Sequence, residues 1–150
     1  MNVIIRTATE ADQPTITSII RAAHINPMDL KWQHFVVAED AGQIVGTGQI
    51  KTHRDGSHEL ASIAVIPERQ GEGVASQIIT TLLADQSGTL YLMCQRSLEP
   101  FYQRFGFSPV TSDQMPPYFR RITKLAGVLS PVSQAVRGEG LNISVMKRKL

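Results

Sequence analysis

Residues 70–76, Gln-Gly-Glu-Gly-Val-Ala-Ser, have the residue types and spacing best suited to binding an anion. They follow the strand-like run 60–66 and open a pattern in which Val74, Ile78 and Leu82 repeat every fourth residue, as on one face of a helix. The first amides of a helix have no internal partner and lie at the positive end of its dipole, and glycines let an anion approach them closely. The segment therefore predicts a phosphate or pyrophosphate site.

Two common phosphate-binding patterns do not fit this turn. The dinucleotide fingerprint would need a third glycine where Ser76 stands, and the mononucleotide loop would need a Gly-Lys-Ser/Thr ending, which is missing. The pattern that fits is Gln/Arg-x-x-Gly-x-Gly/Ala, which Gln70, Gly73 and Ala75 satisfy.

A second motif, Phe-Tyr-x-x-x-Gly-Phe, lies at residues 101–107. Ser97 can cap a short helix over 98–105, and Gly106 ends it. Four apolar or aromatic side chains have the spacing of a single helix face: Leu98, Phe101, Tyr102 and Phe105.

The two motifs, in this order and over roughly 36–110, resemble the GNAT superfamily of acyl-CoA-dependent N-acyltransferases. The resemblance implies acetyl-CoA as co-substrate and no metal. It also implies that the backbone of Ile63, Ala64 and Val65, where the strand splays from its neighbour, binds the pantetheine arm and polarises the thioester carbonyl. The turn would hold the pyrophosphate through Gln70, Gly71, Glu72, Gly73, Val74, Ala75 and Ser76, with the Glu72 carboxylate pointing to solvent.

The resemblance also suggests an acid and a base. Tyr102 would protonate the departing thiolate, since a phenol has a pKa of about 10; the ordinary alternative is a core aromatic. Glu59 lies six residues before Val65, where histone-type members carry a catalytic glutamate, and it shares a strand face with Ile63 and Val65. The alternatives for Glu59 are an exposed strand-end charge and deprotonation through waters. The histidines are weaker candidates, with His53 in a supporting position, His58 on the opposite strand face, and no partner named for His24 or His34.

Three residues near the second motif bear on the cofactor and the mechanism. Many members have Asn seven residues before the tyrosine; Gln95 stands there, so that contact is longer, water-mediated or missing. Arg104 could reach the adenosine end instead. Cys94 lies in an apolar strand and reads as a buried structural thiol, which favours direct transfer in a ternary complex over an acyl-enzyme.

The acceptor site is the least specified part. By family layout, the first helix, the loop 26–32 and the segment 115–124 flank it, with Trp32, Tyr118 and Phe119 as walls. Basic residues on the second segment suggest either an acidic acceptor or a solvated helix face, and we favour the solvated face.

Composition fits one ordinary globular domain over residues 1–150, with 42% apolar and 19% charged residues. No apolar run is long enough for a membrane span, and the first residues are too strand-like for a signal peptide. One cysteine rules out an internal disulfide and makes the cytoplasm the default location. The net charge of +2 is too small to indicate nucleic acid, and strand edges allow a monomer or a homodimer.

The hydrophobic pattern predicts a mixed α/β fold: a central, mostly antiparallel sheet of about six to seven strands with helices on both faces, as in GNAT proteins. The predicted strands are 3–5, 35–39, 43–50, 59–66, 90–94, one at Phe107 and one over 141–148; the helices follow Thr9 and cover 74–84, 98–105 and 117–126.

We therefore expect acetyl transfer from acetyl-CoA to a primary amine of a small molecule or protein. One rival is a non-catalytic acyl-CoA sensor or regulatory subunit of the same fold. The other is a nucleotide-phosphate binder, which would need a magnesium ligand set that the sequence does not offer.

Overall fold

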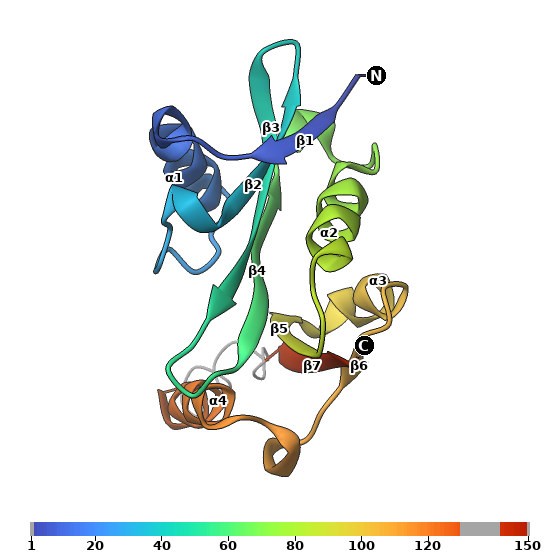
Figure 1. The fold of residues 1–150 in the computed structure, drawn as a ribbon. Helices are drawn as coiled ribbons and strands as arrows, with labels where there is room; N and C mark the ends of the chain where they lie inside the picture. The colour runs from blue at the N-terminus through green and yellow to red at the C-terminus, as the bar shows by residue number, and fades with distance from the viewer. Residues whose placement is uncertain (1, 130–141, 150) are drawn as a thin grey trace. The chain divides into compact units, whose positions relative to one another are not determined.

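A computed structural model describes residues 2–129 and 142–149 of the chain (Figure 1). The described strands are β1 (Ile4–Thr7), β2 (Phe35–Asp40), β3 (Gln43–Thr52), β4 (His58–Val65), β5 (Thr89–Gln95), β6 (Ser108–Pro109) and β7 (Ile143–Lys149). The α-helices are α1 (Gln13–Ala22), α2 (Val74–Ala84), α3 (Glu99–Gln103) and α4 (Pro117–Leu129). No helix among these residues is long and apolar enough to cross a membrane.

The strands form one seven-stranded sheet in the order β1-β2-β3-β4-β5-β7-β6. Pairing is antiparallel between β1 and β2, β2 and β3, β5 and β7, and β6 and β7, and it is parallel between β4 and β5, where Glu59 lies opposite Tyr91. The mixed, mostly antiparallel fold predicted from the sequence is confirmed. Internal contacts group the described residues into two compact units, residues 2–51 with 60–86 and residues 52–59 with 87–129 and 142–149.

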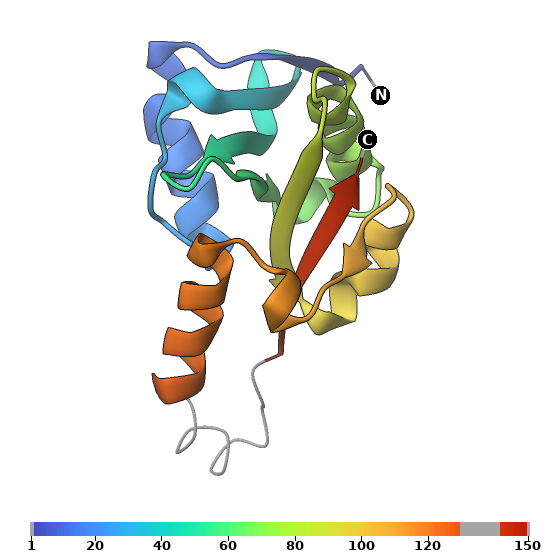
Figure 2. The same cartoon turned by 60° about the horizontal axis from the view of Figure 1, so that its bottom comes forward.

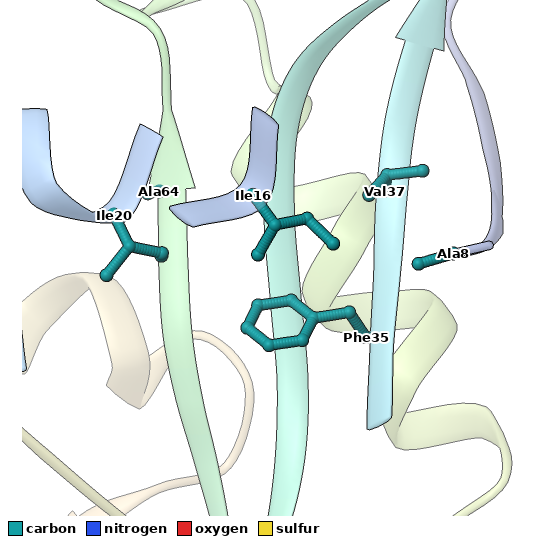
Figure 3. Close-up of a cluster of buried hydrophobic side chains, with 6 residues drawn as sticks. All are labelled: Ala8, Ile16, Ile20, Phe35, Val37 and Ala64. Carbon is teal, nitrogen blue, oxygen red and sulfur yellow. The ribbon is translucent and has the colours of Figure 1, made fainter. Parts of the chain in front are cut away.

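The first unit places α1 and α2 on opposite faces of its strands (Figure 1). A buried cluster packs against the α1 face, with residues from α1, β2, β4 and the loop after β1. Figure 3 shows its members: Ala8, Ile16, Ile20, Phe35, Val37 and Ala64. Ile16 and Ile20 are one helical turn apart, and both are completely buried.

The α2 face depends on two glycines of β3. A Cβ on Gly48 would stand 2.6 Å from Ile78 Cγ2, 2.8 Å from Ile63 Cδ1 and 3.0 Å from Leu82 Cδ1. A Cβ on Gly46 would stand 2.9 Å from Ile78 Cδ1 and 3.2 Å from the Ala64 carbonyl oxygen. These distances leave no room for a side chain, so α2 lies closer to β3 than any other residue would permit.

The second unit is built on β5, which pairs along its length with β7, while β6 pairs with the other edge of β7 (Figure 2). The predicted strand at Phe107 begins one residue later, and Phe107 itself is a buried core residue. The predicted helix over 98–105 is shorter at both ends, since residues 96–98 form a 3-10 turn before α3 and α3 ends at Gln103. Leu98 lies in that turn, so the 3.6-residue period does not apply to it, and it is 43% exposed.

Gly48 provides the first prediction. Gly48→Val inserts atoms where Ile78, Ile63 and Leu82 already pack, so we expect a loss of about 1–3 kcal/mol in the free energy of unfolding. Urea titration would show a lower midpoint with an unchanged slope. Gln43→Val, at an exposed position of the same strand, is the control and should stay within about 0.5 kcal/mol of wild type. A Gly48→Val protein as stable as wild type would contradict the close packing.

Asp12 provides the second testable prediction. It accepts hydrogen bonds from Arg6 Nη1 at 2.7 Å and from the Thr9 amide at 2.8 Å, and the Arg6 bond is the main cause that lowers its pKa from 3.8 to about 2. The folded pKa is below the unfolded one, so the stability it contributes is present above about pH 4 and is lost as the pH falls towards 2.

We therefore expect Asp12→Asn to cost about 1 kcal/mol at pH 7, since solvent screens the partly exposed Arg6. The difference in urea midpoint between variant and wild type should vanish as the pH falls from 4 to 2. Asp85→Asn removes an exposed carboxylate and should show no such trend. A midpoint difference that stays constant down to pH 2 would contradict the ion-pair explanation.

Candidate functional site

The glycine turn has the backbone that an anion site needs. Gly71 and Gly73 have φ of +81° and +84°, a region that only glycine adopts without strain, and Gly73 is the N-cap of α2. Nothing lies within 4 Å of where a Cβ on either glycine would stand, so their backbone is open to a ligand. Gln70 Nε2 donates to the Val65 carbonyl oxygen at 3.1 Å and ties the turn to the last residue of β4.

The charges around the turn leave the helix terminus positive. The first turn of α2 contains no acidic residue. The one carboxylate within the turn, Glu72, accepts from Arg69 Nε at 3.2 Å and has a side chain that is 37% exposed, and Arg69 also pairs with Asp40 at 2.8 Å. The amides of Val74, Ala75 and Ser76 therefore keep their attraction for a phosphate.

An irregularity in β4 precedes the three residues expected to bind the pantetheine arm. Ser62 has φ of +59°, unusual for a residue with a side chain. Two polar side chains of β3 hold it there: Thr47 Oγ1 donates to the Ser62 carbonyl oxygen at 2.9 Å, and Gln49 Nε2 donates to Ser62 Oγ at 2.8 Å. The irregularity interrupts the regular alternation from which a shared face of Glu59 with Ile63 and Val65 was predicted.

The residues after Ser62 divide between the two faces of the first unit. Ala64 is buried in the α1 cluster, while Ile63 Cδ1 lies beside Gly48 on the α2 side. Ile66 donates its amide to the Val45 carbonyl oxygen at 2.9 Å, which keeps the end of β4 on β3.

Glu59 forms a buried pair with His53 in the second unit. His53 Nε2 lies 2.7 Å from Glu59 Oε1, and the two side chains are 8% and 6% exposed. The alternative of an exposed strand-end charge is therefore wrong. His53 also stacks on Tyr118 of α4, with ring centroids 3.5 Å apart and an interplanar angle of 15°. The sequence indicated His53 only by its position beside the hairpin.

Asp55 attaches the same hairpin to α4. Its Oδ2 accepts the Tyr118 amide at 2.9 Å, while its Oδ1 accepts from the amide and the hydroxyl of Ser57. These bonds, the Ser57 hydroxyl first, lower the pKa of Asp55 to about 2, so it is ionised at the N-terminus of α4, where a negative charge is favourable. Phe119 is completely buried and packs against Tyr91 and His53.

Tyr102 is the buried residue of α3 and lies among Phe101 and Phe107. Burial, with a smaller contribution from Cys94, raises the pKa of its phenol to about 12. Cys94 is a buried thiol that contacts Met146 Sδ at 3.8 Å, and burial raises its pKa to about 11. A thiol so protonated is a poor nucleophile at neutral pH.

The two remaining cofactor candidates of the second unit are solvent-facing. Gln95 ends β5 and is exposed. The Arg104 guanidinium lies over the rings of Phe101 and Phe105, 5.6 and 5.9 Å from their centroids.

Trp32 lies in the loop between α1 and β2 and packs against the buried cluster of the first unit. Gln13 of α1 fixes that loop, because its Oε1 accepts the Trp32 amide at 2.9 Å and its Nε2 donates to the Leu30 carbonyl oxygen at 2.6 Å. Sequence reasoning missed Gln13 and also two buried polar residues of β3, Gln49 and Lys51. The signal for that pair was the alternation of polar residues at 47, 49 and 51 with Gly48 and Ile50 in β3.

No three His, Cys, Asp or Glu side chains come together as a metal site in residues 2–129 and 142–149.

The family model described as the acetyltransferase (GNAT) domain matches residues 31–109. No curated protein matches the chain. Among solved structures, N-acetylglutamate synthase from Neisseria gonorrhoeae, complexed with coenzyme A and N-acetyl-glutamate, is similar with a TM-score of 0.77 and 20% identity. That match covers 100% of this chain and 35% of the synthase, so this chain spans about a third of the synthase's length.

Two further similar structures match over nearly their whole length. Rv2747 from Mycobacterium tuberculosis, in complex with CoA and NLQ, has a TM-score of 0.72 and 22% identity over 98% of this chain and 99% of that one. The ribosomal-protein-S18-alanine N-acetyltransferase from Escherichia coli has a TM-score of 0.69 and 16% identity over 99% and 94%. These similarities establish the fold.

Proposed function

Because the chain belongs to the GNAT family of acetyltransferases, we propose that it transfers an acetyl group from acetyl-CoA to a primary amine by direct attack in a ternary complex. The observation that carries the proposal is the start of α2, where two positive-φ glycines open the backbone and no acidic residue neutralises the first turn. The Gln70–Ser76 turn would hold the pyrophosphate on its amides. The backbone of Ile63, Ala64 and Val65 would bind the pantetheine arm and polarise the thioester carbonyl.

Glu59 acts in this proposal as the general base. The acceptor arrives as an ammonium, and the Glu59 carboxylate takes one proton from it so that the nitrogen can attack the thioester carbon. His53 holds the carboxylate in one orientation through the 2.7 Å bond, and stacking on Tyr118 fixes the imidazole in turn. A water-linked base remains the alternative that the variants below discriminate.

Tyr102 acts as the general acid. As the C–N bond forms and the C–S bond breaks, the thiolate leaves and receives the phenolic proton. The nitrogen gives up its second proton as the amide forms, and that proton restores the phenol of Tyr102. With a pKa of about 12, Tyr102 carries that proton throughout the working pH range. Burial that penalises the phenolate also penalises a thiolate held beside it, so both pKa values rise and the transfer stays near balance.

Thiol release from acetyl-CoA across a panel of amines tests the proposal, with wild type beside Tyr102→Phe. We expect turnover on at least one amine class and a loss of about 10²- to 10⁴-fold in the variant, with CoA binding retained. Wild-type turnover should show no alkaline loss from Tyr102 below about pH 11, because its pKa is about 12. Tyr91→Phe removes a phenol from β5 and is the matched control.

Full turnover by Tyr102→Phe would contradict its role as acid. Tight CoA binding without turnover on any amine would favour the non-catalytic sensor instead.

Glu59→Gln keeps an oxygen acceptor for His53 but removes the base. We expect the kcat/KM of this variant to fall about 10²- to 10⁴-fold at pH 7. It should recover tenfold per pH unit as the amine loses its own proton, up to an amine pKa of about 10.4. Glu10→Gln, an exposed carboxylate, serves as the control. A Glu59→Gln enzyme with the wild-type rate and pH profile would assign deprotonation to water.

A further inference from the structure

Lys51 of β3 is a buried ammonium with few partners. It is 5% exposed, and its Nζ donates to the Met28 carbonyl oxygen at 3.1 Å. An ammonium has three donors, and in residues 2–129 and 142–149 no carboxylate lies within ion-pair distance of this one. A buried charge without a counter-charge costs folding free energy, so the position calls for a ligand or another compensation.

Gln49 lies two residues earlier, on the same face of β3, and is completely buried. Its Nε2 donates both to the Asp29 carbonyl oxygen at 3.1 Å and to Ser62 Oγ at 2.8 Å. Its Oε1 is buried and has no hydrogen-bond partner in the part of the chain that the structure describes. Most buried acceptors in folded proteins have a partner, so this one calls for an explanation.

The loop between α1 and β2 covers both side chains. Two of its carbonyl oxygens, those of Met28 and Asp29, turn towards β3 to accept from Lys51 and Gln49, while the Met28 side chain is 65% exposed. Asp29 has φ of +57°, so the loop adopts a costly backbone conformation at this place. Gln13 fixes the following residues of the loop, which makes this a built arrangement rather than a loose end.

Lys51 Nζ, which has donors to spare, and Gln49 Oε1, which lacks a partner, are complementary to a single ligand. Lys51 offers donors and positive charge, which suit a carboxylate, and Gln49 Oε1 offers an acceptor, which suits an N–H group. Gln49 also bonds Ser62, directly before the backbone proposed to hold the thioester. An amine bound at Gln49 would thus lie beside that backbone within the same unit.

We propose that Lys51 and Gln49 form the acceptor subsite and that the acceptor is a carboxylate-bearing amine, that is, an amino acid. This inference rests on the proposed function and names its substrate class. Lys51 Nζ binds the carboxylate, and Gln49 Oε1 accepts from the amine to be acetylated.

The test compares amino acids with their carboxamides, which keep the amine and lose the negative charge. Thiol release from acetyl-CoA should show kcat/KM about 10- to 100-fold higher for the free acids than for the carboxamides, and Lys51→Met should remove that preference. Lys51→Arg keeps the charge and should restore part of the preference. Lys149→Met removes an exposed ammonium and is the control.

Thermal unfolding separates this role from a structural one. If Lys51 serves a ligand, Lys51→Met leaves the Tm unchanged or raises it by a few degrees, because an uncompensated buried charge is gone. A Tm several degrees lower, with the preference for free acids intact, would assign Lys51 to holding the loop and overturn the proposal.

The remaining outcomes distinguish the subsite from the proposed reaction. If amines without a carboxylate are acetylated as fast as amino acids, the proposed subsite is wrong, while the proposed acetyltransferase activity is supported. If no amine is acetylated, titration calorimetry of the CoA-loaded protein with the free amino acids tests whether the subsite binds them. Binding of one of them that Lys51→Met abolishes would support the subsite, and no binding would overturn it.

Discussion

The candidate cofactor site depends on how closely α2 approaches β3. Gly46 and Gly48 remove the side chains that would hold the helix away, and Ile78 and Leu82 occupy that space. This packing fixes the helix N-terminus relative to the end of β4, and Gln70 completes the link by its bond to the Val65 carbonyl oxygen. A helix dipole attracts an anion only over its first turn, so the position of that turn decides whether a phosphate is held.

The candidate sites also gather the polar groups that the fold buries at a cost. In the first unit, Thr47 and Gln49 hold Ser62 in its positive-φ conformation, and Lys51 lies beside them. In the second, the Glu59 and His53 pair is fixed by stacking on Tyr118, and Asp55 binds the start of α4. An apolar core would avoid these desolvation costs. Buried polar groups that are concentrated beside proposed reacting groups are therefore typical of a functional site.

The sequence predicted those parts of the site that local rules govern. The start and end of α2 followed from a glycine turn and a regular apolar repeat, and the observed helix covers the predicted 74–84. The positive φ of Ser62 was not predictable, because it depends on side chains from another strand. The burial of Glu59 depends on packing around the hairpin and α4, which the order of residues does not reveal. The spacing of Leu98 from Phe101 predicts a shared, buried helix face. That prediction is wrong because the spacing alone does not distinguish a 3-10 turn, where Leu98 lies, from an α-helix.

Amide chemical shifts of the glycine turn test the central claim, that the start of α2 holds the pyrophosphate of an acyl-CoA. In a titration with CoA followed by ¹H–¹⁵N correlation spectra, we expect large, saturable changes at Gly71, Gly73 and Val74–Ser76. Pantetheine, which lacks the pyrophosphate, should leave these amides nearly unchanged. Saturable CoA binding without shifts in residues 71–76, or equal shifts with pantetheine, would contradict the account.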